Sequence, residues 1–315
     1  MATVTIGNDN VDFSAFTFPS TGSPTTLTSN FIEFTLADGS TTDVSGSFSL
    51  SGGTISGTIT SFARFDPPAA GASSGDLIFS VTGISVPVAT FIGFEQTNNV
   101  AGLENYVFTG NDVWTSGTGN DVFIETAGSN TISGGGGLDE YKANDPQSSY
   151  VITRTGENAF TIAKPDGGTD TVTGVARILF SDGTALAMDV NGTAGQIYLL
   201  YQGALDRAPD LPGLGYWIYQ ADHGASLVTI AGDFVSSTEF TQLYGSSTNV
   251  TQFVTNLYEN LLHRAPDAAG LAYWVSSGET PAQLLASFAE STENQANFIG
   301  VIGNGIHYTP WVPTT

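Results

Sequence analysis

Hydrophobic and polar positions alternate through the first third of the chain. The alternation is clearest in FIEFTLADGSTTDVSGSFSLSGGTISGTITSFARFD and continues in GDLIFSVTGISVPVATFIGF. A period of two places successive side chains on opposite faces of a strand, and the pairs Asp38-Gly39 and Gly52-Gly53 are typical of hairpin turns. We therefore predict an all-β, sandwich-like region over residues 1–100.

A nine-residue period replaces the alternation between Val107 and Lys142. The four consecutive units read VFTGNDVWT, SGTGNDVFI, ETAGSNTIS and GGGGLDEYK. Glycine at position four permits a tight turn with positive φ, and the large apolar residue at position eight is expected to point inward and stack on the next coil. Positions four, six and eight are Gly110, Gly119, Gly128 and Gly137; Asp112, Asp121, Asn130 and Asp139; Trp114, Phe123, Ile132 and Tyr141.

The side chains at position six indicate a metal site. Carboxylates and turn carbonyls supply the oxygen ligands that a hard cation such as calcium prefers. We predict one to three calcium ions held by this set: Asp112, Asp121, Asn130, Asp139, Asn111, Asn120, Gly110, Gly119 and Gly137. The first and third units lack a leading glycine pair, which leaves open a Gly/Asn/Asp-rich loop with chance periodicity. The opening GNDNVDFSAF either copies half a unit (Gly7, Asp9, Asp12) or is a simple turn.

The register of these units resembles the G-G-x-G-x-D-x-U-x repeat of RTX, or hemolysin-type calcium-binding, β-roll proteins. The resemblance implies a short calcium β-roll over residues 101–145. It also implies export by bacterial type I secretion with an uncleaved C-terminal signal. Calcium outside the cell would then fold the roll by binding linkage.

A further β segment over residues 146–191 is expected to cap the roll. Its alternation predicts strands at Tyr150–Thr153, Phe160–Ala163, Thr169–Val172 and Ala176–Phe180. The string Y-x-I-x-R-x-G … G-T-D-T-V resembles the segment that closes β-rolls. Asp170 and Asp182 either add calcium oxygens or are turn residues that bond to their own backbone.

The hydrophobic period becomes 3.6 near Gly192, which predicts helices. YQGALDRAPDLPGLGYW (201–217) matches YENLLHRAPDAAGLAYW (258–274) at a constant offset of 57 residues, and FVSSTEF (234–240) matches FAESTEN (288–294). We predict an all-α domain of two repeats over residues 192–303, followed by a tail over 304–315. The repeat resembles domain-of-unknown-function family 4214, which implies an exported or surface-layer-associated bacterial protein.

The Arg-Ala-Pro-Asp box of each repeat has a structural interpretation. Proline ends the preceding helix, and the aspartate accepts the unpaired amide protons of the next one. The arginine can bond to that aspartate, and the aromatic pair that follows, Tyr-Trp in each repeat, packs in the core. The alternative is a sugar-stacking aromatic platform. The residues concerned are Arg207, Asp210, Trp217, Arg264, Asp267 and Trp274.

Composition narrows the function. A formal net charge of −23 with only 7 Lys+Arg disfavours nucleic acid and anionic membranes as partners, and suits divalent cations. The absence of cysteine excludes disulfides and thiol chemistry. No apolar run is long enough to span a membrane, and no N-terminal signal peptide is visible. The apolar tail, IHYTPWVPTT, either carries the export signal or packs on the helices.

No catalytic constellation is found. His223, His263 and His307 have no partners at metal or base spacing, and His263 is expected to be a solvated helix residue. We predict an α+β multidomain protein that is non-enzymatic, extracellular and calcium-binding. It would be a surface-layer, matrix or adhesin component that contacts itself or cell-surface glycan. The alternatives are a carbohydrate-binding module or accessory part of a polysaccharide-acting system, and a hydrolase in residues 1–100.

Overall fold

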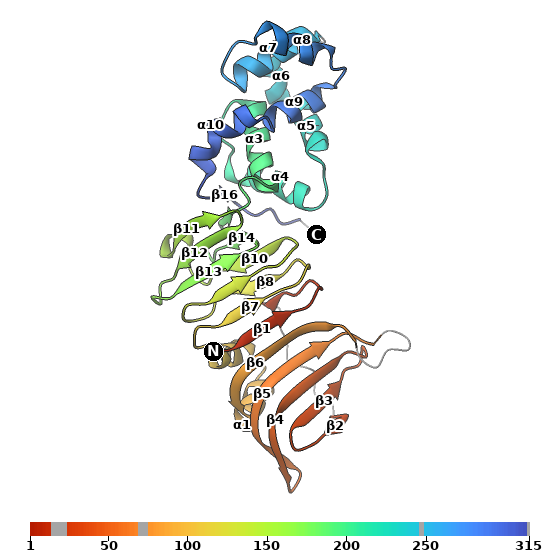
Figure 1. Ribbon diagram of the computed structural model, residues 1–315, viewed down its shortest axis with the longest axis vertical. Helices are drawn as coiled ribbons and strands as arrows, with labels where there is room; N and C mark the ends of the chain where they lie inside the picture. Colours follow the sequence, from red (N-terminus) through yellow and green to blue (C-terminus); the bar gives the residue numbers. More distant parts are fainter. Residues whose placement is uncertain (14–23, 69–74, 246–248, 314–315) are drawn as a thin grey trace. The chain divides into compact units, whose positions relative to one another are not determined.

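The computed structural model describes residues 1–13, 24–68, 75–245 and 249–313. The chain divides into two compact units, Met1–Ser181 and Asp182–Thr315, so the division falls before residue 191, where the period change had placed it. The fold is mixed α+β, with most helices in the second unit (Figure 1). The predicted fold class is confirmed at this level.

The N-terminal strands form an antiparallel meander. Gly52 and Gly53 have φ of +60° and +82° and form the turn between the two longest strands, and Gly39 has φ of +87°. Both predicted turns are therefore present. The strands are β2 (Thr26–Leu27), β3 (Phe31–Thr35), β4 (Thr41–Ser51), β5 (Thr54–Phe65) and β6 (Leu77–Pro87).

The predicted sandwich is not found among the described residues. These strands belong to a single sheet of order β11-β12-β13-β9-β7-β1-β6-β5-β4-β3-β2, in which β1 (Thr3–Ile6) joins the meander to parallel strands. The all-β prediction is also wrong for α1 (Val88–Gln96), and α2 (Val100–Val107) stands where the roll was predicted to begin; the two helices pack against β5 and β6. A short apolar run such as VATFIGF does not by itself distinguish a strand from a buried helix.

The nonapeptides form a coil that alternates between two parallel ladders (Figure 1). Strands of one ladder, β7 and β9, carry Trp114 directly opposite Ile132, and strands of the other, β8 and β10, carry Phe123 opposite Tyr141. All four side chains are at most 2% exposed, which confirms that position eight points inward. The ladders are β7 (Val113–Thr115), β9 (Thr131–Ser133) and β13 (Thr169–Thr173); β8 (Val122–Ile124), β10 (Asp139–Lys142) and β14 (Val175–Leu179).

The segment after the nonapeptides contains the predicted strands, with bounds that differ by at most three residues. β11 (Val151–Gly156) and β12 (Ala159–Ala163) are an antiparallel pair, and β12 leads into β13. β13 then runs parallel to β9, so the hairpin is an insertion after which the chain returns to the coil.

The second unit repeats a four-helix pattern. The first set is α3 (Thr193–Leu205), α4 (Leu211–Asp222), α5 (Leu227–Ser236) and α6 (Thr238–Tyr244). The second is α7 (Val250–Asn260), α8 (Ala268–Ser276), α9 (Pro281–Ala289) and α10 (Thr292–Ile302). The predicted helical repeat is thus present. No helix among the described residues has the length and hydropathy required to cross a membrane.

The tail packs within the second unit as far as it is described. β16 (Ile306–Tyr308) pairs antiparallel with β15 (Ala185–Ala187). The Trp311 ring lies 5.3 Å from Tyr216 and 4.8 Å from Tyr219, centroid to centroid. Packing on the helices, one of the two alternatives for this segment, is therefore observed; residues 314–315 lie outside the described residues, and the export signal stays a prediction.

Candidate metal centre

Tight turns between the coil strands stack in two columns. The first column consists of turns 107–112, 125–130 and 164–170, and the second of turns 7–11, 116–121 and 134–139. Neighbouring turns within the nonapeptide region are 18 residues apart, which is two repeat units.

One hydrogen bond recurs along both columns. The backbone N–H at position six donates to the Oδ1 atom of the position-six side chain in the next turn. Asp121 donates to Asp139 at 2.8 Å in the second column, and Asp112 donates to Asn130 at 2.8 Å in the first. The side chain at position six therefore serves as a link between coils, because its oxygen satisfies a backbone donor that would otherwise be buried and unpaired.

The second oxygen of each position-six aspartate in the nonapeptides has no hydrogen-bond partner among the described residues. These orphaned Oδ2 atoms belong to Asp112, Asp121 and Asp139, which are 1%, 0% and 0% exposed. The Ser116 hydroxyl lies near Asp121, but it donates its proton to the Gly134 carbonyl oxygen at 2.7 Å. Leaving a buried carboxylate oxygen unsatisfied is costly, so three such atoms in equivalent places require a physical explanation.

Burial also disfavours the charged form of these carboxylates. Desolvation raises the pKa of Asp139 to about 7, and the nearby charge of Asp121 adds to the shift. Desolvation likewise raises the pKa of Asp121, against the lowering effect of the Val11 N–H bond. A divalent cation between the two carboxylates would remove the repulsion and favour their ionised forms.

Turn carbonyls in the second column lie close to the glycines of the next turn. A Cβ atom on Gly135 would lie 2.1 Å from the Gly117 carbonyl oxygen and 2.4 Å from that of Ser116. A Cβ on Gly137 would lie 2.2 Å from the Gly119 oxygen, so glycine is needed here for close approach as well as for its φ of +95°. The positive φ expected at position four is absent from the first two units, at Gly110 and Gly119. Glycine is still required at Gly119, because a Cβ atom there would lie 2.2 Å from the Asp9 carbonyl oxygen.

These atoms fit calcium chemistry in the second column. The described residues contain no cluster of three or more His, Cys, Asp or Glu side chains suited to a metal. Calcium also accepts backbone carbonyls, however, and the Ser116, Gly117 and Gly119 carbonyl oxygens lie where turn 116–121 stacks on turn 134–139, the two turns that end at Asp121 and Asp139. The groups that would hold a calcium ion here are therefore the two carboxylates and backbone carbonyls of these turns.

Three predicted ligands serve mainly as links between turns. The Asn111 Oδ1 atom accepts from the Ser129 N–H at 2.9 Å, and the Asn120 Oδ1 atom accepts from the Leu138 N–H at 2.7 Å. Asn130 turns its amide group toward its own turn, where Nδ2 is 3.3 Å from the Thr126 carbonyl oxygen. An amide N–H at this place satisfies an oxygen that elsewhere would be available to a cation.

The opening segment joins the second column, with a register that differs from the sequence alignment. The Val11 N–H donates to Asp121 Oδ1 at 2.8 Å, so Val11 occupies position six. Asp12 forms a parallel bridge with Val122 and lies 3.7 Å from Lys142 Nζ through its Oδ2 atom. Of the two alternatives, a coil-like turn is observed, but the proposed match of Gly7, Asp9 and Asp12 was shifted.

Sequence reasoning missed a fifth unit. PDGGTDTVT (165–173) has glycine at position four, Asp170 at position six and Val172 at position eight, and Val172 is fully buried opposite Ile132. The signal was present but out of phase, because the β11–β12 hairpin separates it from the others. Asp182, by contrast, is a turn residue whose Oδ1 atom accepts from the Thr184 N–H at 3.0 Å.

The Arg-Ala-Pro-Asp boxes form the helix caps that were predicted for their aspartates. Asp210 and Asp267 cap α4 and α8, each accepting a backbone N–H, from Gly213 and Gly270, at 2.8 Å. The main partner of each arginine was missed: Arg207 Nε lies 2.7 Å from Glu239 Oε1, and Arg264 Nε lies 2.6 Å from Glu293 Oε1. The signal was the Ser-Thr-Glu sequence shared by FVSSTEF and FAESTEN.

The aromatic pairs are less buried than expected. Trp217 packs on Phe234 and Trp274 on Phe288, each with ring centroids 5.0 Å apart. Tyr273 is 66% exposed, so core packing is wrong for this residue, whose counterpart in the first repeat is covered by the tail. His263 is exposed, but it follows α7 with φ of +54° and so is not a helix residue.

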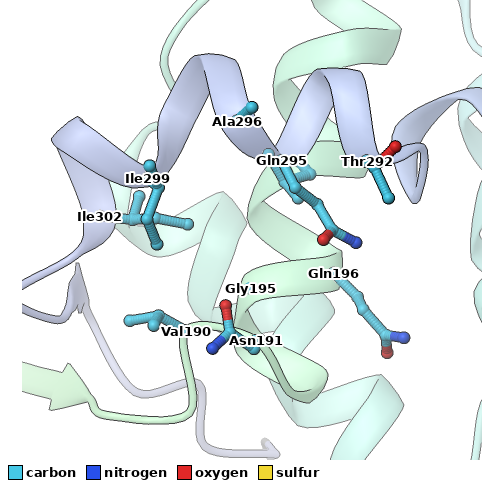
Figure 2. A pocket seen from close by; sticks show the side chains of 10 residues that line it. Val190, Asn191, Gly195, Gln196, Thr292, Gln295, Ala296, Ile299 and Ile302 are labelled. Carbon is cyan, nitrogen blue, oxygen red and sulfur yellow. The ribbon is translucent and has the colours of Figure 1, made fainter. Parts of the chain in front are cut away.

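The second unit also has a cavity of about 250 Å³ (Figure 2). The side chains that line it come from the start of α3, the loop before it and α10, and include the amides of Asn191, Gln196 and Gln295. None of the described lining residues is aromatic, so a stacking platform for sugars is not part of this cavity.

Comparisons with known proteins place part of the second unit. Residues 231–298 match the family described as Domain of unknown function (DUF4214). The chain carries a DUF4214 domain. The match begins within α5 and ends within α10, so it covers α6–α9 and is shorter than the predicted two-repeat domain over residues 192–303.

Other comparisons add little. No curated protein matches the chain. Among solved structures, the extracellular lipase LipA from Serratia marcescens is similar at 21% identity and a TM-score of 0.22. That similarity covers 23% of this chain and 12% of the lipase chain, so this chain spans a small part of that protein.

Proposed function

We propose that the coil is a calcium-binding β-roll of the RTX type, capped by residues 146–181, and that calcium is required for its full stability. The observation that carries this proposal is the set of orphaned, buried Oδ2 atoms on Asp112, Asp121 and Asp139. Their equivalent positions in stacked turns favour bound cations over chance periodicity. The pair formed by Asp121 and Asp139 is the leading site, because the two carboxylates are close enough for their charges to interact and the carbonyls of one turn closely approach the next turn.

The protein as a whole is proposed to be a non-enzymatic, extracellular component of a bacterial surface layer, matrix or adhesin. The RTX-like repeats and the DUF4214 domain support export by type I secretion. A net charge of −23 makes copies repel one another until divalent cations neutralise or bridge them. Exposed strand edges then offer a route to self-association. Strand β11 lies at one edge of the sheet, and its Val151 is 69% exposed.

Isothermal titration calorimetry with the metal-depleted chain tests the calcium proposal. We expect one to three ions to bind, with a rise in Tm in millimolar calcium. Light scattering in calcium and in chelator then tests assembly: we expect large assemblies with calcium and a monomer of 32.7 kDa without it. No heat of binding together with an unchanged Tm would refute the metal site, and a monomer in both conditions would refute assembly.

A second candidate function is binding of cell-surface glycan through the second unit. The specific observation is the amide-lined cavity in Figure 2, since amide groups hydrogen-bond to sugar hydroxyls. A glycan array probed with the chain, and with Gln295→Ala as the matched variant, would test it. Hits that disappear in the variant would support this function, and an array without hits would exclude the glycans on it.

A further inference from the structure

A buried ammonium group lies in the first column. The side chains of Lys164 and Asp170 are both 0% exposed, and Lys164 Nζ lies 3.0 Å from Asp170 Oδ1. The same Nζ atom donates to the Thr126 carbonyl oxygen at 2.5 Å. Thr126 and Asp170 belong to consecutive turns, so the ammonium bridges turn 125–130 to turn 164–170.

This bridge occupies an interval equivalent to the candidate calcium site. The Asn130 N–H donates to Asp170 Oδ1 at 2.8 Å, as the Asp121 N–H does to Asp139 Oδ1. A Cβ on Gly168 would lie 2.0 Å from the Gly128 carbonyl oxygen, which matches the close approach at Gly137. Turn 164–170 therefore stacks as the other turns do, with an ammonium between a carbonyl and a carboxylate.

The remaining polar atoms of this interval are also satisfied. Asp170 Oδ2 accepts from the Tyr141 hydroxyl at 2.8 Å. The Asn130 amide covers the Thr126 and Ala127 carbonyls at 3.3 and 3.4 Å. Within the described residues, Asp170 has no orphaned oxygen, in contrast to the three nonapeptide aspartates.

We propose that the Lys164 ammonium is a built-in substitute for the metal ion between turns 125–130 and 164–170. This interval takes no calcium, and it stays folded when calcium is absent. An ammonium is a compact charge with three donors, so it can satisfy oxygens of the kinds that a cation would bind. Here these are the Thr126 carbonyl and Asp170 Oδ1, while the Tyr141 hydroxyl satisfies Asp170 Oδ2. The inference rests on the proposed function for the other intervals, and it gives the coil one pre-ordered end on which the calcium-dependent turns can fold.

Two substitutions separate this role from that of an ordinary ion pair. Lys164→Met fills the space without charge, whereas Lys164→Ala leaves room for a cation. In chelator, we expect both to lower Tm by about 10 °C, because each leaves a buried carboxylate unpaired. Millimolar calcium should raise the Tm of Lys164→Ala by much more than it raises the Tm of the parent chain, and calorimetry should count one additional bound ion. Lys164→Met should show neither effect. Lys142→Ala, at a partly exposed ion pair, is the matched control and should change Tm little.

Hydrogen exchange of the parent chain gives a readout that needs no variant. In chelator, we expect peptides over 125–133 and 164–173 to remain protected while those over 116–121 and 134–139 exchange. Equal loss of protection in both sets, or equal ion counts for the parent chain and Lys164→Ala, would overturn the inference. If the parent chain binds no calcium at all, the proposed function fails. The role of Lys164 would still be supported if propylammonium restored the Tm of Lys164→Ala but not that of Lys164→Met.

Discussion

The coil and the helical repeats both place aspartates at tight turns, and they satisfy the carboxylates in different ways. Asp267 is an exposed residue at the start of α8, where it accepts the Gly270 N–H and has an arginine 4.0 Å away. Asp139 is fully buried and bonds through one oxygen, while its second oxygen has no partner among the described residues. The helical turn is complete on its own, whereas the coil turn leaves one buried carboxylate oxygen without a partner among the described residues.

The pKa shifts follow the same division. Hydrogen bonds lower the pKa of Asp210 and Asp267, chiefly from the Tyr201 hydroxyl and the Gly270 N–H respectively. Desolvation raises the pKa of Asp139 to about 7. The helical repeat therefore satisfies these carboxylates with backbone and side-chain donors alone. Under the proposed function, the stacked turns take a cation instead, supplied from solution or by a lysine.

Removal of calcium should give the largest difference between the two regions. At a free calcium concentration 1,000 times Kd, each ion adds about 4 kcal/mol to the free energy of unfolding of the folded coil. Chelation should therefore abolish hydrogen-exchange protection over 107–142 outside the Lys164 interval and leave α3–α10 unchanged. Equal effects on both regions would contradict the comparison.

Asp139→Asn should place in the second column an amide group like that of Asn130 in the first, which donates to carbonyl oxygens of its own turn. In calcium, we expect the loss of one bound ion and of about 2–4 kcal/mol of unfolding free energy, measured by calorimetry and urea denaturation. In chelator, the variant should be at least as stable as the parent, because it removes a disfavoured buried charge. Asp267→Asn is the matched control: asparagine caps helices as well as aspartate does, so it should behave like the parent in both conditions.

The pH dependence in chelator should have opposite signs in the two regions. The folded pKa of Asp139, about 7, exceeds its unfolded value near 3.8, so the coil should lose stability as pH rises between these values and then level off. The pKa values of Asp210 and Asp267 lie below 3.8, so their contribution is present above that pH and is lost only at lower pH. Urea denaturation monitored by region-specific hydrogen exchange checks both signs.

Arg207→Ala should have the smallest effect. Its guanidinium contacts Glu239 at 2.7 Å on a side chain that is 41% exposed, and such exposed pairs contribute less than about 1 kcal/mol. The loss should be equal in calcium and chelator and should shrink in high salt, as thermal unfolding at two salt concentrations would show. A calcium-dependent loss would mean that the helical repeat is coupled to metal binding.

Several features could be predicted because they depend on neighbours in sequence. The nonapeptide period placed Trp114 and Phe123 inside the coil, and the Arg-Ala-Pro-Asp box located the caps of α4 and α8. Others depended on long-range pairing. The helices at 88–107 were missed because a short apolar run is ambiguous, and the fifth unit at 165–173 was missed because a hairpin interrupts the period.

The sequence by itself determined the period of the coil, the side chains that fill its interior, the helical repeat and the strongly acidic charge. Tertiary structure alone decided which aspartates keep an orphaned oxygen. Val11 meets Asp121 across 110 residues, and Lys164 meets the Thr126 carbonyl across 38. Local spacing sets where a side chain points along its own turn, but the partner of a buried carboxylate comes from whichever segment stacks beside it.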